Sequence, residues 1–203
     1  MRKANQVEHL PGGVTAIFLK HKGQVLQCLI DTTDYDQVKG FRWCAWRHGR
    51  TFCAATTRVK KRGGRTTAYL HRLLFPGVAE IDHRNGDPLD NRRSNLRPAS
   101  RAQNNANTRK YKNGMTSRFK GVCFDKFQAN FRATIQVNRR QLCLGRFDSE
   151  EEAARAYNRA ALEHFGEFAR LNWLEPLSDK SEPGQFVPRK TVELVVEFKL
   201  IQT

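Results

Sequence analysis

The stretch IDHRNGDPLDNRRSNLRPASRAQNN, residues 81–105, sets the fold and the chemistry of this chain. Asp82 and His83 are adjacent, Asn95 follows His83 by twelve positions, and Asn104 follows Asn95 by nine. Four polar side chains at defined spacings in an arginine-rich context are candidates for a single site.

The residue types in this stretch suit phosphodiester hydrolysis. An attacking water must lose a proton, and the neutral imidazole of His83 is a suitable base near pH 7. Charge on the leaving oxygen needs a cation, and oxygen ligands from Asp82 and Asn104 suit Mg²⁺ or Mn²⁺ better than Zn²⁺. Asn95 is a candidate to accept a hydrogen bond from the far ring nitrogen and fix the tautomer.

Local signals arrange these side chains in space. Asn-Gly-Asp-Pro at 85–88 is a strong turn signal, and residues 99–107 suit a short helix capped by Ser100. If Asp82 and His83 sit on a strand, their side chains point to opposite faces, so one can hold a metal while the other faces water.

The stretch resembles the HNH endonuclease signature, with Asp-His on a first strand, Asn-Leu in the return loop and a helix bearing the last ligand. The resemblance implies a β-hairpin and a helix around one metal ion, the ββα-metal or His-Me finger motif. It implies that His83 is the general base, Asn95 its orienting partner, and Asp82 and Asn104 the metal ligands. The asparagine in the last position resembles the phage and intron-encoded branch of the family.

Neighbouring residues extend this resemblance. Asn105 and Asn107 compete for the last ligand position, and the family spacing favours the earlier asparagine. The block Tyr-Leu-His-Arg at 69–72 also resembles the N-terminal half of that branch, which implies that His71 and Arg72 support the site or a phosphate.

The charge distribution predicts a polyanionic partner. The 203 residues carry a net charge of +16, from 36 Lys and Arg against 20 Asp and Glu. Residues 39–72 hold ten basic side chains and no acid, and residues 101–146 hold eleven with one acid, Asp125. Most charge runs are solvated surfaces, but two dense stretches of one sign in so short a chain favour phosphates as the ligand.

The N-terminal part is predicted to be rich in β-structure. Alternating apolar and polar residues over 14–31, around His-Lys-Gly at 21–23, indicate a β-hairpin. Further elements are expected in this order: a short helix and then a strand with Trp43 and Trp46 within 34–47, a strand over 51–59, a basic glycine turn over 60–65, and a helix over 69–75.

A second module is predicted after residue 117. Residues 130–137 alternate, so that Phe131, Ala133, Ile135 and Val137 face one way and Arg132, Thr134 and Gln136 the other. A partner strand over 139–147 is expected to turn Leu142 and Leu144 inward. A capping box of Ser149 and Glu152 opens a helix that Gly166 ends, with this inner face: Ala153, Tyr157, Ala160, Ala161 and Phe165.

Residues 117–173 resemble the AP2/ERF DNA-binding domain over its whole length. The motifs that carry the resemblance are Phe-Lys-Gly-Val at 119–122, Phe-Arg-Ala-Thr-Ile at 131–135, Leu-Gly-Arg-Phe at 144–147, Glu-Ala-Ala-Arg-Ala-Tyr at 152–157 and Leu-Asn-Trp at 171–173. It implies a three-stranded antiparallel sheet with one helix behind, the sheet lying in the DNA major groove.

The outward face departs from that family. Positions where plant members carry arginines hold Cys123, Asp125, Gln136 and Gln141, which weakens readout of guanine by arginine and leaves the glutamines as adenine readers. The expected DNA-binding residues are Lys120, Lys126, Arg132, Thr134, Gln136, Arg139, Arg140, Gln141 and Arg146. For Arg139 and Arg140, a solvated hairpin turn is an equally good interpretation of either residue alone.

The expected class is α+β, with a nuclease domain over 1–110, a linker over 111–116, the sheet-and-helix domain over 117–173 and a tail over 174–203 that contains a possible edge strand. No stretch is apolar enough to span a membrane, and the N-terminus lacks an apolar signal core. Five cysteines without a CxxC pair fit an intracellular setting, expected to be the cytoplasm of a bacterial or phage-infected cell.

These features predict a metal-dependent endonuclease that cuts duplex DNA, acts on no small molecule, and resembles mobile, homing-type nucleases. One site per chain predicts nicking by a monomer, with double-strand cleavage only where DNA pairs two chains. Two alternatives remain: a DNA-binding regulator with an inert hairpin, and an RNA-binding structural protein, which the charge alone suggests.

Overall fold

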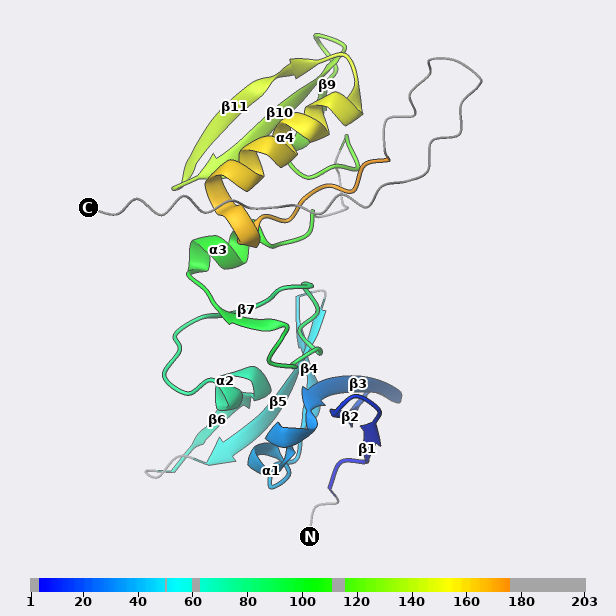
Figure 1. Ribbon diagram of the computed structural model, residues 1–203, viewed down its shortest axis with the longest axis vertical. Helices are drawn as coiled ribbons and strands as arrows, with labels where there is room; N and C mark the ends of the chain where they lie inside the picture. Colours follow the sequence, from blue (N-terminus) through cyan, green and yellow to red (C-terminus); the bar gives the residue numbers. More distant parts are fainter. Residues whose placement is uncertain (1–3, 50, 60–62, 111–115, 176–203) are drawn as a thin grey trace, which may run out of the picture.

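The computed structural model describes residues 4–49, 51–59, 63–110 and 116–175, which form a mixed α+β fold of small antiparallel sheets and short helices (Figure 1). Most of the predicted linker and the predicted tail strand lie outside these residues. In the described part of the chain, no helix has the length and apolarity to cross a membrane.

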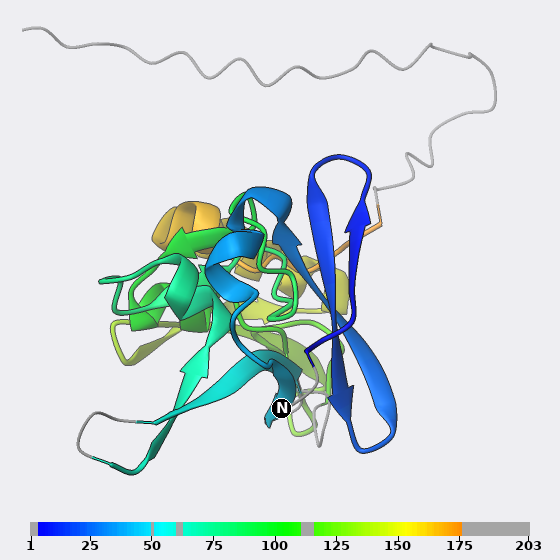
Figure 2. The same ribbon diagram turned by 90° about the horizontal axis from the view of Figure 1, so that it is seen from below.

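The first sheet is an antiparallel ribbon of β1 (Val7–Leu10), β2 (Val14–His21) and β3 (Gln24–Asp31). The hairpin expected over 14–31 is confirmed, with His21 opposite Gln24 across a two-residue turn. Both turn residues have positive φ, 44° at Lys22 and 84° at Gly23, as tight hairpin turns require. Figure 2 shows β2 and β3 as a long twisted ribbon at one side of the molecule.

A second sheet packs beside this ribbon. Its strands are β4 (Cys44–His48), β5 (Thr51–Val59) and β6 (Arg65–Tyr69), with α1 (Tyr35–Val38) and α2 (Leu70–Leu74) flanking them. The strand β6 was not predicted, because its sequence RTTAY has no apolar alternation and pairs along β5 mainly through its backbone. The shared core contains Ile17, Leu19, Ile30, Val38, Trp43 and Leu70.

The stretch 81–105 forms a short hairpin and a helix: β7 (Ile81–His83), β8 (Leu96–Pro98) and α3 (Arg101–Ala106). In the hairpin, Asp82 lies opposite Arg97. The predicted cap is confirmed, since the Ser100 hydroxyl accepts from the backbone of Gln103 and the Gln103 side chain accepts from the backbone of Ser100. This reciprocal cap fixes where α3 starts, and so which of its side chains face β7.

The N-terminal ribbon holds the long loop between β7 and β8. The Leu29 amide donates to Leu89 (2.9 Å), and the Asn91 amide donates to Leu29 (2.7 Å). The Arg93 guanidinium binds the buried carboxylate of Asp34 through two nitrogens, at 2.8 and 2.9 Å. The loop is thus pinned by backbone pairing and an ion pair to residues about sixty positions earlier.

The C-terminal part is a three-stranded antiparallel sheet in the order β11-β10-β9, with one helix across it (Figure 1). Four of the five residues of the predicted inner helix face are buried, and the fifth, Phe165, packs against their cluster. Ser149 caps the helix as predicted, although the reciprocal bond from Glu152 is absent. The elements are β9 (Val122–Asp125), β10 (Asn130–Val137), β11 (Arg140–Phe147), α4 (Glu150–Phe165) and the 3-10 helix η2 (Gly166–Phe168).

The strand β10 confirms the predicted alternation, because Ala133 and Ile135 are buried beneath α4 while Arg132 and Gln136 are exposed. The predicted inner face of β11 is confirmed, because Leu142 lies opposite the buried Ile135 and Leu144 packs against the buried cluster. Leu142 nevertheless keeps 40% of its surface exposed, on a strand at the edge of the sheet.

Close packing of α4 on the sheet depends on Gly121. This residue has φ +77°, and a Cβ placed there would lie 2.0 Å from the Tyr157 ring and 2.7 Å from the Thr134 carbonyl oxygen. Only glycine satisfies both the backbone conformation and the approach of the ring.

Candidate active site

Asp82 and His83 point to opposite sides of β7, as expected for neighbours on a strand. His83 is 9% exposed and faces the pinned loop, where its Nε2 lies 3.3 Å from the Oδ1 of Asn91. The His71 ring packs edge-on against it, with ring centroids 5.3 Å apart. The structure therefore brings the two predicted histidines together, and Arg72 is exposed beside them on α2.

The Asn91 amide is held so that its oxygen faces His83. This side chain is completely buried, and its nitrogen donates to Cys28 Sγ (3.3 Å) and to the Pro88 carbonyl (3.2 Å). The remaining oxygen can only accept, so the proton of the His83 ring lies on Nε2 and Nδ1 carries the lone pair. Within the described residues Nδ1 has no hydrogen-bond partner, so its lone pair is free to accept a proton.

Burial keeps both imidazoles neutral. It lowers the pKa of His83 below the usual 6.5, although the hydrogen bond that the ring donates to Asn91 acts in the opposite direction. It lowers the pKa of His71 to about 3, with a further contribution from His83. A neutral ring with an accessible lone pair is the form a general base requires at neutral pH.

Asn95 clamps the loop instead of touching the ring. Its side-chain oxygen accepts from the Asn85 amide (3.0 Å), and its nitrogen donates to the Asp90 carbonyl (2.7 Å). The expected hydrogen bond between Asn95 and His83 was therefore wrong within the described contacts, and Asn91 takes that place. A buried asparagine that bonds two backbone groups across a turn stabilises the loop. Its spacing from His83 alone does not distinguish this structural role from contact with the ring.

The Asp82 carboxylate is buried in an ion pair. The Arg97 guanidinium approaches its Oδ2 at 2.8 Å through Nε and 2.7 Å through Nη2, and both side chains are less than 10% exposed. Asn107 donates to the same carboxylate at 3.0 Å and to the His83 carbonyl at 2.8 Å. Both oxygens of Asp82 are thus engaged by the protein itself.

Asn104 lies on the same side of α3 but bonds to Glu80, with its Nδ2 3.3 Å from the Glu80 Oε2. Asn105 is exposed and faces away. The amide that the structure places on Asp82 is that of Asn107, one turn after Asn104 on the same helix face. The predicted pairing of Asp82 with Asn104 is not among the contacts of the described residues.

Arg97 also joins the hairpin to the C-terminal part. Its Nη1 donates to the Glu167 carbonyl (2.9 Å), and its guanidinium stacks 3.7 Å from the centroid of the Phe168 ring. Arg84 reaches the Glu167 carboxylate at 2.8 Å. Sequence reasoning missed Arg97, although pairing the strands of the hairpin would have set it opposite Asp82.

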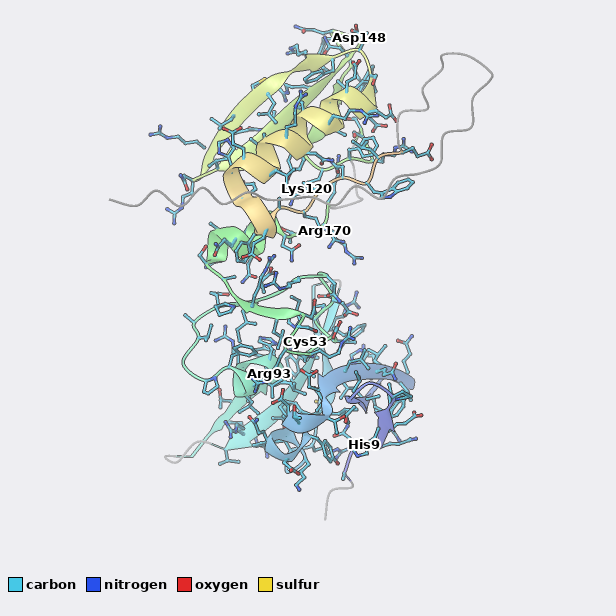
Figure 3. The ribbon with its side chains drawn as sticks, in the orientation of Figure 1. His9, Cys53, Arg93, Lys120, Asp148 and Arg170 are labelled. Carbon is cyan, nitrogen blue, oxygen red and sulfur yellow. The ribbon has the colours of Figure 1, made fainter. Side chains whose placement is uncertain are left out.

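The predicted DNA-binding residues fall into two groups. The first group lies on the sheet face away from α4, where cross-strand neighbours pair as Arg132 with Arg146 and Gln136 with Gln141, and Thr134 lies opposite Cys143, which was not predicted. The second group is exposed at the turns and consists of Lys126, Arg139 and Arg140. Lys120 does not belong to that face. Its ammonium donates to the Ala106 carbonyl at the end of α3, between the two halves of the molecule (Figure 3).

Comparison with known proteins defines the class of this site. Residues 68–106 match the HNH endonuclease family, a segment that contains α2, the β7–β8 hairpin and α3. This segment is therefore similar to the HNH endonuclease domain, whose family members are nuclease hydrolases. The match ends before the sheet of β9–β11.

One relative is an uncharacterized HNH endonuclease, L560, of Acanthamoeba polyphaga mimivirus. It is 32% identical over 114 residues, which cover 52% of this chain and 58% of the relative. The chain thus matches somewhat more than half the length of that protein.

HNH nucleases generally use a divalent metal ion, and the residues at β7 and α3 fit such an ion only in part. Glu80, Asp82 and Asn104 supply the hard oxygen donors that Mg²⁺ prefers. In the arrangement observed, however, Arg97 and Asn107 engage Asp82, and no group of three or more His, Cys, Asp or Glu side chains in the described ranges is placed to hold a metal. An ion at Asp82 requires the Arg97 guanidinium to give way.

Proposed function

We propose that this protein is a metal-dependent endonuclease that hydrolyses phosphodiester bonds in duplex DNA, with His83 as its general base. The observation that carries the proposal is the His83–Asn91 pair. A buried amide holds the ring as a neutral imidazole whose Nδ1 has no hydrogen-bond partner among the described residues.

The proposed step uses the free ring nitrogen of His83. A water next to Nδ1 transfers a proton to it while the water oxygen forms a bond to phosphorus. The ester P–O bond opposite breaks, and the leaving oxygen takes up a proton from solvent. Asp82 and Asn104 would hold the ion, proposed to be Mg²⁺ or Mn²⁺, which would neutralise the charge that develops on the leaving oxygen. Asn95 serves this step by fixing the loop that carries Asn91, and His71 by packing against the base.

Residues 117–173 are proposed to place the nuclease domain on duplex DNA as an AP2/ERF-like module. The sheet face opposite α4 is uncovered and carries paired basic and amide side chains on neighbouring strands. Bases are proposed to be read by Thr134, Gln136 and Gln141, and phosphates to be held by Lys126, Arg132, Arg139, Arg140 and Arg146.

One His83 site per chain supports nicking by a monomer, with double-strand cleavage where DNA brings two chains together. This behaviour is proposed as that of a homing-type nuclease, acting inside a bacterial or phage-infected cell.

The test is nicking of supercoiled plasmid in Mg²⁺ or Mn²⁺. His83→Ala is expected to lower the rate about 10²- to 10⁴-fold, because general-base catalysis contributes that factor. His164→Ala, an exposed histidine on α4, is the matched control and should keep the wild-type rate. Full activity in His83→Ala would remove the base from the scheme.

A second function is favoured by the Asp82–Arg97 pair, which closes the carboxylate to an ion in this arrangement. It is that of a DNA-binding regulator with an inert hairpin. Duplex binding that persists in chelator, with no cleavage in Mg²⁺, Mn²⁺ or any other divalent ion, would establish it. Equal competition by duplex RNA would instead indicate an RNA-binding protein, because the A-form major groove excludes a sheet.

A further inference from the structure

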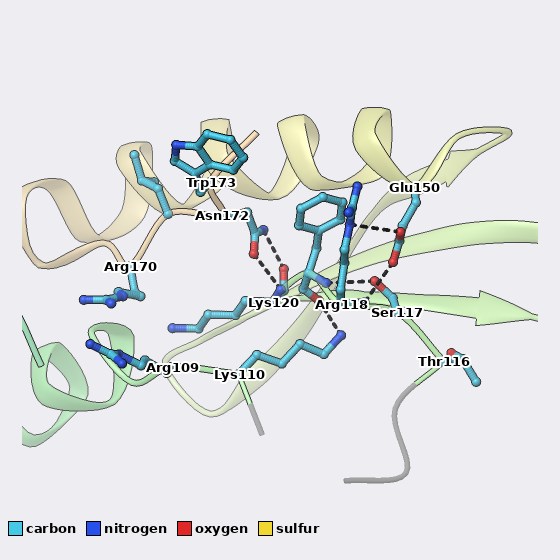
Figure 4. A pocket seen from close by; sticks show the side chains of 12 residues that line it. Arg109, Lys110, Thr116, Ser117, Arg118, Lys120, Glu150, Arg170, Asn172 and Trp173 are labelled. Atoms are coloured by element: carbon cyan, nitrogen blue, oxygen red, sulfur yellow. Dashed lines mark hydrogen bonds and ion pairs between the residues drawn. The ribbon is translucent and has the colours of Figure 1, made fainter. Parts of the chain in front are cut away.

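A cavity of about 720 Å³ lies where the C-terminal part meets the end of α3 (Figure 4). Residues from both sides line it, and five of its twelve lining side chains are basic. Its one acid, Glu150, is already engaged, since it accepts from the Arg118 amide at 2.9 Å. Lys110 is engaged as well, through bonds to the Phe119 and Val122 carbonyls.

Three other cations converge at one end of this cavity. The side chains of Arg109, Lys120 and Arg170 come from three separate segments and end side by side (Figure 4). Arg109 Nη2 and Arg170 Nη1 both donate to the Asn85 carbonyl, at 3.4 and 3.1 Å, and Lys120 Nζ donates to the Ala106 carbonyl at 2.5 Å. Within the ranges the structure describes, none of the three has a carboxylate partner.

This grouping is unfavourable without an anion. Burial first and the neighbouring Arg170 second lower the pKa of Lys120 to about 8. Burial and Arg109 likewise lower the pKa of Arg170. Three like charges held together by backbone carbonyls retain unused N–H donors, and an anion would satisfy the donors and offset the repulsion.

We propose that Arg109, Lys120 and Arg170 form a phosphate site that binds a backbone phosphodiester of the DNA strand being cut. The site touches the catalytic hairpin directly, because Asn85 is two residues after His83. A phosphate held here fixes the strand relative to the base and also joins the two halves of the protein. That the bound phosphate belongs to DNA rests on the proposed function, whereas the binding of a phosphate group does not.

The first experiment tests the anion site without any nuclease reaction. Unfolding temperature is measured in EDTA with and without inorganic pyrophosphate, on wild type, Arg109→Gln, Arg170→Gln and the control Arg159→Gln, an exposed arginine on α4. Wild type and Arg159→Gln should be stabilised by the anion, and the two site variants should lose most of that increment. Without anion, the site variants should unfold no earlier than wild type, because each removes a repelled charge.

The second experiment uses fluorescence anisotropy of a labelled duplex, again in EDTA. Arg170→Gln should weaken binding about tenfold, the worth of one charge-assisted hydrogen bond, and should reduce the slope of log K against log salt by about one. Arg159→Gln should change neither quantity. A deoxynucleoside monophosphate should compete only at far higher concentration than the duplex.

Each result has a clear consequence. Equal pyrophosphate increments in wild type and both site variants, or an unchanged salt slope in Arg170→Gln, would overturn the site. Preferential binding of the mononucleotide over duplex would overturn the assignment to a DNA backbone. If wild type cuts no DNA in any metal but is stabilised by pyrophosphate, the nuclease proposal fails while the anion site stands. If wild type cuts DNA but pyrophosphate stabilises it no more than the site variants, the anion site fails while the nuclease proposal stands.

Discussion

The two halves of the molecule use polar side chains in opposite ways. In the described part of the chain, eleven polar or charged residues are buried, and ten of them lie before residue 110. The exception in the second half is Ser117. Residues 4–110, called the nuclease half after their proposed function, thus hold their polar groups in a closed network, where partners fix each orientation. Residues 116–175, called the sheet half, leave their polar groups on the surface, where they can adapt to a ligand.

The hydrophobic cores of the two halves also differ. The nuclease half is filled by large aliphatic side chains such as Ile17, Leu19 and Leu70, which support a rigid loop. The sheet half is filled by alanines of α4 against Phe119 and Val122. The more rigidly packed core thus lies in the half where catalysis is proposed. The sheet half depends on close packing between one helix and one sheet.

The largest effect is expected from opening the buried network at Arg97. Arg97→Met leaves the Asp82 carboxylate buried without its cation, which should cost about 3–5 kcal/mol of unfolding free energy. The measurement is denaturant unfolding. Arg84→Met, which removes only the exposed pair with Glu167, is the control and should cost less than about 1 kcal/mol. A loss below 1 kcal/mol in Arg97→Met would mean that Asp82 is not closed in solution.

A slightly smaller effect is expected from the packing of the sheet half. Gly121→Ala adds a methyl group where the Tyr157 ring already lies, at a positive φ, and should cost about 2–4 kcal/mol. Gly23→Ala, in the hairpin turn between β2 and β3, is the control, because φ is +84° there with open space around it, and should cost about 1 kcal/mol. Equal losses in both variants would show that α4 does not pack on the sheet as described.

Acid should destabilise the nuclease half through its buried histidines. The unfolded imidazole of His71 takes up a proton as pH falls below 6.5, and the folded one does so only near pH 3. The unfolded state therefore binds more protons in this pH range. Through this residue, the free energy of unfolding is expected to decrease by about 1 kcal/mol as the pH is lowered from 7 to 5.5. Urea unfolding of His71→Gln should show a correspondingly shallower pH dependence; an unchanged dependence would place His71 in solvent.

The smallest effect on stability is expected on the exposed sheet face. Asp125 binds Arg146 at 2.7 Å in an exposed ion pair, so Asp125→Asn should change stability by less than about 1 kcal/mol. It should nevertheless strengthen duplex binding, because Arg146 is released and an acid is removed from the proposed DNA face. Anisotropy with the double variant Asp125→Asn, Arg146→Gln should show that gain abolished. Weaker binding of Asp125→Asn would argue against this face.

Much of this arrangement could be predicted from local patterns. The turn at 21–23, the cap at Ser100 and the alternation along 130–137 each depend on residues close in sequence, and each was confirmed. Asp82, His83 and His71 could be singled out for the same reason. Arg97 was missed although pairing the two strands of the hairpin places it opposite Asp82. The roles of Asn91 and Asn107 could not be predicted, because Asn91 depends on Cys28 from a distant strand and Asn107 on the strand that packs against α3.

The pairing of Leu29 with the loop that carries Asn91 has a practical consequence for protein engineering. The segment recognised as an HNH endonuclease begins at residue 68, yet the strand and the carboxylate that hold its loop lie at residues 29–34. A minimal fragment trimmed to the recognisable segment, or a graft of that segment onto another scaffold, would leave the loop without its backbone partner. A transplanted segment therefore has to include the amino-terminal ribbon of β1 to β3.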